Sequence, residues 1–129
     1  MKRSLFILWT LLWVLMLPFH HVSEAQIGRV TLRYKIEQNL LYYEKTSEAL
    51  TEYMRARCRL DLYYPERYTN FPTVVWFHGG GLREGERHVP NPLKNQKIAV
   101  AAVDYRLYPR VHCPAYIEDA AAAVAWVFK

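Results

Sequence analysis

The order of hydrophobic and polar residues divides the chain into segments with different periods. From Gln26 to Tyr43 the pattern is mixed, with a stretch of alternation that favours a half-buried strand or an extended arm. Residues 59–63 alternate again and Pro65 follows them, so we predict a strand there. Between these two segments, Ser47 to Arg57 has apolar residues at helical spacing, with Ser47 as a candidate cap.

Two further segments, Thr73–Phe77 and Ile98–Val103, are short and almost entirely apolar. A strand that is apolar on both sides belongs to a sheet covered on both faces, which usually means parallel strands with helices above and below. The residues between the two segments are numerous enough for a crossover, in which we predict a short helix around Pro92 to Gln96. The pattern therefore predicts a βαβ unit within an α/β fold.

A last helix is predicted from Pro114 onward. Pro114 suits the first helical turn, and Glu118 and Asp119 lie near enough to the start to favour the helix dipole. The run Ala120–Ala123 consists of strong helix formers. The predicted buried face consists of Tyr116, Ala120, Val124 and Val127.

The first 25 residues form a segment of their own. Lys2 and Arg3 precede an almost unbroken apolar run from Leu5 to Phe19, and Ser23 and Ala25 then occupy small-residue positions in a polar stretch. This arrangement is typical of a cleaved signal peptide. The alternative is a membrane anchor, but the apolar run is shorter than the roughly 20 residues that a spanning helix needs. We therefore expect a secreted or periplasmic protein, cleaved after Ala25.

Charge and cysteine content add little to this picture. The net charge of +5 comes from scattered residues without a basic run, which favours solubility and gives no indication of nucleic-acid binding. No pattern indicates a metal, a nucleotide or another cofactor. Cys58 and Cys113 would enter an oxidising compartment. Two interpretations stay open for them: a disulfide, or two buried thiols that pack as small hydrophobic groups.

A glycine triplet directly follows the first of the two apolar strands. Phe77 and His78 lead into Gly79, Gly80 and Gly81. Glycine permits positive φ and leaves main-chain N–H groups open to a ligand. Two such groups aimed at one point form an oxyanion hole, in which each donor stabilises the transition state of acyl transfer by about 2.7–4 kcal/mol. A bare triplet is more often a flexible turn, but the preceding strand and histidine favour the oxyanion hole.

Three segments together resemble one family. Val74–Gly81 resembles the HGGG motif of the esterase and lipase branch of the α/β-hydrolases. Val103–Pro109 resembles the DYRL-x-P segment after the next strand of that branch, and Glu118–Trp126 resembles its following helix. Residues 60–65 are similar to an early strand of secreted members close to the feruloyl and acetyl-xylan esterase group. The resemblance covers about residues 58–129 in the family's order.

The resemblance implies a mainly parallel sheet flanked by helices and a serine esterase that needs no cofactor. Its substrate would be a carboxylic ester, either a small molecule or an acyl group on a polysaccharide. Gly80 and Gly81 would supply the oxyanion-hole N–H groups, and Gly79 would allow the turn. His78 would orient this loop rather than act as the catalytic base. Leu82 departs from the aromatic residue often found after the glycines, which leaves the shape of the acyl pocket open.

The family's catalytic triad has no counterpart in this sequence. Its nucleophile is a serine in Gly-x-Ser-x-Gly after the next strand, and the acid and base follow later. Ser4, Ser23 and Ser47 lie in no such frame, and Cys113 lies at the wrong place in the strand order to replace them.

We therefore predict a signal peptide over 1–25, an N-terminal extension over 26–57 and a partial α/β-hydrolase domain over 58–129. The partial domain would end before the nucleophile and would be inactive alone. Its two apolar strands would be sheet edges with unpaired backbone groups.

Asp104 and Arg106 are expected to be structural, with an ion pair to Glu118 or Asp119. Two other functions stay open. One is a subunit that completes its sheet with another chain carrying the triad. The other is a non-catalytic secreted binding module that uses an aromatic surface. The tyrosines of that surface would be Tyr42, Tyr43, Tyr63, Tyr64 and Tyr68.

Overall fold

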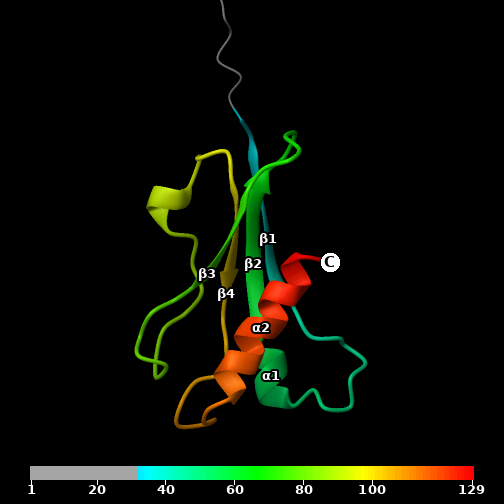
Figure 1. Ribbon diagram of the computed structural model, residues 1–129, viewed down its shortest axis with the longest axis vertical. Helices are drawn as coiled ribbons and strands as arrows, with labels where there is room; N and C mark the ends of the chain where they lie inside the picture. The colour runs from blue at the N-terminus through cyan, green and yellow to red at the C-terminus, as the bar shows by residue number, and fades with distance from the viewer. Residues whose placement is uncertain (1–31) are drawn as a thin grey trace, which may run out of the picture. The chain divides into compact units, whose positions relative to one another are not determined.

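The computed structural model describes residues 32–129 (Figure 1). The predicted signal peptide, its cleavage after Ala25 and the beginning of the N-terminal extension lie outside the described residues. Across residues 32–129, no helix has both the length and the hydrophobicity to cross a membrane.

The described chain forms one mixed sheet and a small number of helices. The sheet has the strand order β1-β2-β4-β3, in which β3 and β4 run parallel and the other neighbours run antiparallel (Figure 1). The parallel pairing predicted for the two apolar segments is confirmed. The four strands do not form a mainly parallel sheet, because the other two pairs are antiparallel. The elements are β1 (Tyr34–Leu41), α1 (Glu52–Arg57), β2 (Arg59–Pro65), β3 (Thr73–Phe77), the 3-10 helix η2 (Asn91–Leu93), β4 (Ala99–Val103) and α2 (Ala115–Val127).

Strand β4 lies at the centre of the sheet. Each of its residues is at most 1% exposed, because β2 pairs with one side of the strand and β3 with the other. The prediction that both apolar strands would be edges is therefore wrong for β4, since nothing in the sequence indicated that β2 would pair with it. Only β3 of the two lies at the edge of the sheet.

The hydrophobic core lies between the sheet and the two α-helices. Leu60 of β2 and Val103 of β4 are fully buried there, against Met54 of α1 and Ala123 of α2. Figure 1 shows α2 in front of the lower part of the sheet and α1 just below the strands, where β2 begins. Burial of a side chain the size of Leu60 contributes about 1.5–3 kcal/mol to folding.

Helix α1 begins later than predicted. Thr51 is its N-cap, and the Thr51 hydroxyl accepts the N–H of Met54 at 3.2 Å. Ser47 lies in a preceding turn instead, where its carbonyl accepts the N–H of Leu50 at 3.1 Å. A threonine hydroxyl at this position accepts an N–H group that has no partner within the first helical turn. The cap is therefore Thr51, four residues after the predicted Ser47. The crossover helix predicted around Pro92 to Gln96 is the short 3-10 turn η2.

Helix α2 is confirmed, but its most buried positions differ from the predicted face. Asp119 and Ala123 are both fully buried, whereas the four predicted positions are only partly buried. Arg106 explains the difference, because its Nη2 donates to Asp119 Oδ1 at 2.7 Å and its Nε to Oδ2 at 2.8 Å. Tyr43 donates a further hydrogen bond to Oδ1 at 2.8 Å. The hydrogen bond with Asp119 raises the pKa of Arg106, and the expected ion pair is confirmed.

Neither interpretation of the cysteines matches the structure in full. Both thiols are free, with Cys58 buried in the core and Cys113 exposed just before α2. A disulfide is therefore absent from the described chain, and only Cys58 packs as a buried thiol. Burial raises the pKa of Cys58 to about 12.

The aromatic surface proposed for a binding module does not form. Tyr42 is 5% exposed, and its hydroxyl donates to the carbonyl of Asp104 at 2.9 Å. Tyr63 and Tyr64 are partly buried, and their hydroxyls donate to Asn95 and Glu37. Among these tyrosines Tyr68 is the exposed one, because the others use their rings for packing and their hydroxyls for internal hydrogen bonds.

The exposure of the two cysteines predicts selective alkylation. At pH 8, a thiol with a pKa of about 12 is a thiolate in roughly one molecule in ten thousand, and Cys58 is also shielded from reagent. Iodoacetamide should therefore modify Cys113 alone in the folded chain and both cysteines in urea, as measured by peptide mass spectrometry. Rapid modification of Cys58 without urea, or a Cys58–Cys113 linked peptide, would contradict the structure.

The buried Arg106–Asp119 pair predicts that removing the charge of Asp119 strongly destabilises the folded chain. Asp119→Asn should lower the free energy of unfolding by about 3 kcal/mol, because it leaves the guanidinium without its buried counter-charge. Glu118→Gln is the matched control, since that side chain is 62% exposed and its carboxylate lies 4.0 Å from Arg106. It should change stability by less than about 0.5 kcal/mol. Urea titrations followed by circular dichroism measure both, and equal effects would refute the role of Asp119.

Candidate functional site

The glycine triplet lies where two parallel strands end. Strands β3 and β4 are aligned so that Phe77 lies opposite Val103, and the next residue of each strand is His78 or Asp104. Parallel strands in register bring their carboxyl ends to the same side of a sheet, so these two side chains meet there. Both are buried, His78 at 4% and Asp104 at 3% exposure.

Two of the three glycines have a backbone conformation that disfavours other residues. Gly80 has φ of 113° and Gly81 has φ of 60°. A Cβ on Gly80 would also lie 2.0 Å from the carbonyl oxygen of Glu84, whereas a Cβ on Gly79 would meet nothing within 4 Å. The structure therefore requires glycine at Gly80, and it shows no steric requirement at Gly79.

The N–H groups of Gly80 and Gly81 are not used inside the protein. Among the hydrogen bonds of residues 32–129, none has either group as its donor. The bend is closed through carbonyl groups instead, because Gly80 O accepts the N–H of Arg83 at 3.1 Å and that of Glu84 at 3.3 Å. Leu82 O accepts the N–H of Tyr108 at 2.9 Å, which ties the bend to the segment after β4. Two exposed donors on a fixed bend are available to a ligand.

His78 holds the bend from inside. Its Nδ1 lies 2.7 Å from the carbonyl oxygen of Gly79, and a carbonyl can only accept, so this nitrogen is the donor. The ring stacks on Tyr105 with centroids 4.6 Å apart, and the Tyr105 hydroxyl donates to the carbonyl of His78 at 2.8 Å. Gly85, with φ of 112°, passes so close that a Cβ there would lie 2.3 Å from His78 Nδ1. These contacts are those of a positioning residue.

Asp104 is the charged centre beneath the bend. Its Oδ1 accepts the backbone N–H of Arg87 at 2.7 Å, and its Oδ2 accepts Nη1 of the same arginine at 2.6 Å. Arg57 Nη2 lies 3.6 Å from Oδ1, and His78 Nε2 lies 3.4 Å from it. Asp104 is structural, as expected, but it pairs with these residues rather than with α2.

Sequence reasoning missed both arginines of this cluster. Burial by itself would lower the pKa of Arg87, but its hydrogen bonds to Asp61 and Asp104 outweigh burial and raise the pKa. Arg57 donates to the carbonyl of Gly85 at 3.0 Å and so fixes the far end of the bend. No periodicity marks either residue, because an arginine that pairs with a distant carboxylate has the same local sequence signal as one on the surface.

An apolar hollow of about 380 Å³ lies next to the bend. Leu82 forms part of its wall, together with Phe77 and Tyr105 from the strand ends and Tyr116 and Ile117 from α2. Leu82 has φ of 63° and is 40% exposed. The combination of unused N–H donors and an adjacent apolar wall suits a ligand with one polar oxygen and an apolar substituent.

Curated relatives match a little less than half of the chain. Carboxylesterase NlhH from Mycobacterium tuberculosis is 40% identical over 63 residues, which cover 45% of this chain and 20% of the relative. Esterase LipI from the same species is 43% identical over 61 residues, covering 43% and 19%. Human arylacetamide deacetylase-like 2 is 40% identical over 75 residues, covering 49% and 18%. The chain thus spans about a fifth of the length of these relatives.

Solved structures give the same result for the fold. Esterase B from Lactobacillus rhamnosis superposes with a TM-score of 0.58 at 30% identity, covering 77% of this chain and 31% of that one. The same esterase inhibited by a tributyrin phosphonate gives a TM-score of 0.56 at 31% identity, covering 73% and 30%.

The fold expected from the motifs is therefore confirmed as part of an α/β-hydrolase. The family model BD-FAE matches residues 60–129, which is more than half of the sequence and includes the glycine bend, Asp104 and α2. With the esterase relatives and the esterase folds, this match shows that the chain belongs to the BD-FAE family of α/β-hydrolase esterases.

Proposed function

We propose that this chain supplies the oxyanion-binding part of a carboxylic ester hydrolase. The observation that carries the proposal is the pair of unused N–H groups on Gly80 and Gly81 just beyond the carboxyl end of β3. Acyl transfer places negative charge on the carbonyl oxygen of the substrate, and donors that are already fixed stabilise that charge without reorganisation. Family membership supports ester hydrolysis as the reaction class.

The other residues of the site would act on the geometry of these donors. His78 and Gly85 pack against each other and leave the bend little freedom. Asp104 and its arginines anchor the chain on both sides of it. The apolar hollow beside Leu82 would hold the hydrocarbon part of the ester and exclude water from the charged oxygen, which strengthens the hydrogen bonds.

We further propose that the chain is exported and that it does not hydrolyse esters by itself. Lys2, Arg3 and the apolar run that follows support a cleaved signal peptide. The absence of a Gly-x-Ser-x-Gly frame in the sequence supports inactivity, because bound ester would have no nucleophile to attack it.

The purified chain should not turn over p-nitrophenyl acetate above the rate of buffer with an inert protein. The release of p-nitrophenolate, recorded at increasing substrate concentration, measures this. Saturable release that persists after Cys113→Ala would contradict the proposal, because the chain would then contain a nucleophile other than its exposed thiol.

The oxyanion role predicts different effects of two glycine substitutions in the longer reading frame. The gene read past the codon for Lys129 should encode a strand and Gly-x-Ser-x-Gly within about 25 codons. In that longer enzyme, Gly80→Ala should lower kcat by about 100- to 1000-fold, because the methyl group collides with Glu84 O and displaces the donors.

Gly79→Ala is the matched control and should change kcat by less than about tenfold, since its methyl group meets open space. Equal losses for the two variants would refute the assignment. A stop codon directly after Lys129 would contradict the prediction of a longer enzyme.

A further inference from the structure

A second hollow, of about 440 Å³, lies beside β1 and shares no lining residue with the hollow at Leu82. We call it the basic pocket, because Lys45, Arg55 and Arg59 line it and no carboxylate does so in the described part of the chain. Within residues 32–129, Lys45 and Arg55 form no salt bridge. Three positive charges around one hollow repel each other, and a bound anion would relieve that repulsion.

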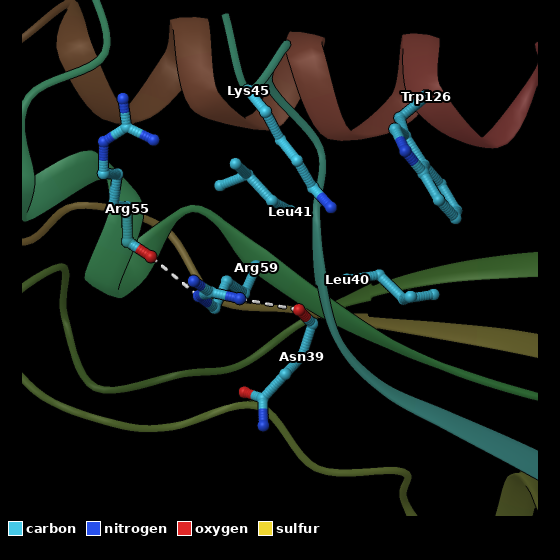
Figure 2. A pocket seen from close by; sticks show the side chains of 7 residues that line it. All are labelled: Asn39, Leu40, Leu41, Lys45, Arg55, Arg59 and Trp126. Atoms are coloured by element: carbon cyan, nitrogen blue, oxygen red, sulfur yellow. Dashed lines mark hydrogen bonds between the residues drawn. The ribbon is translucent and has the colours of Figure 1, made fainter.

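The polar end of the basic pocket is held in place by hydrogen bonds. Arg59 Nε donates to the carbonyl of Arg55 at 2.7 Å, and Arg59 Nη1 donates to the carbonyl of Asn39 at 2.7 Å (Figure 2). Asn39 lies in a β-bulge of β1 with φ of 60°, and its N–H donates to Asp61 at 2.9 Å. Arg87 donates to the Asn39 side chain. A ligand would therefore meet a preorganised guanidinium and lose less entropy on binding.

The remainder of the basic pocket is apolar. Leu40, Leu41 and Trp126 complete its lining, and Trp126 comes from α2 near the end of the helix. Figure 2 shows Arg55 and Trp126 at opposite sides of the pocket, with Arg59, Lys45 and the two leucines between them. An inorganic anion would leave the indole and leucine surfaces wet, whereas a neutral apolar molecule would leave the cations without a partner. The lining matches a molecule that has both parts.

We propose that the basic pocket binds a small organic anion with an apolar body, of the class of medium-chain carboxylates. The carboxylate lies against Arg59 and Lys45, where charge-assisted hydrogen bonds are strong, and Arg55 adds a third positive charge to the lining. The hydrocarbon chain covers Leu40 and Trp126 and is removed from water. The site is independent of the oxyanion bend, and the proposal does not rest on ester hydrolysis.

Isothermal titration calorimetry at pH 7 and low ionic strength tests the proposal with octanoate. Two probes separate the parts of the ligand: 1-octanol has the same chain without charge, and acetate has the charge without the chain. We expect octanoate to bind at least about tenfold more tightly than either probe. Binding should weaken as salt is added, because the cations are partly exposed. Equal affinity for octanol, or for acetate, would overturn the proposal.

A charge-matched pair of variants locates the site. Lys45 and Arg55 are exposed, and within residues 32–129 neither side chain forms a salt bridge, so Lys45→Gln with Arg55→Gln should leave the circular dichroism spectrum unchanged. This double variant should weaken octanoate binding at least about tenfold. Arg33→Gln with Arg67→Gln removes the same charge from exposed positions outside the pocket and should change the affinity less than about twofold.

Equal loss in both double variants would show a non-specific charge effect and overturn the assignment. Tight binding to vesicles of anionic lipid, with none to octanoate, would also overturn it, because the basic groups would then serve a membrane surface rather than a soluble carboxylate.

Discussion

One buried carboxylate holds together the parts of this chain that carry its chemistry. Asp104 is 3% exposed and receives two hydrogen bonds from Arg87, with Arg57 and His78 close by. A charge in such a place is tolerated only when it is paired, so the arginines must stay where they are. Because Arg57 belongs to α1, the carboxylate fixes a helix, the central strand and the glycine bend relative to one another.

The features that could be predicted from the sequence are local ones. The apolar segment Thr73–Phe77 and its glycine triplet are contiguous, and so are the segment before Asp104 and the helix after Pro114. Period and turn chemistry are properties of neighbouring residues, which is why these elements and the parallel pairing of β3 with β4 followed from the pattern. The family resemblance rests on the same contiguous motifs.

The features that the sequence did not reveal depend on partners far apart in the chain. Asp119 was expected to favour the helix dipole and to be a candidate ion-pair partner, yet it is one of the two fully buried positions of α2, because Arg106 and Tyr43 reach it from other segments. In the same way the hydroxyl of Tyr42 donates to the carbonyl of Asp104, which is 62 residues away in the chain. Polar side chains that are buried through hydrogen bonds do not follow a hydrophobic period, so their burial could not be predicted from the sequence.

Strand β3 forms one border of the sheet, with the glycine bend at its carboxyl end. Adjacent strands are separated by about 4.8 Å, a distance set by backbone hydrogen bonds rather than by side chains. A strand added alongside β3 in the same direction would therefore lie about one strand spacing from it across the sheet, whatever its sequence. The backbone sets this lateral distance, so the register of the added strand alone would decide how far along the sheet one of its side chains stands from the bend.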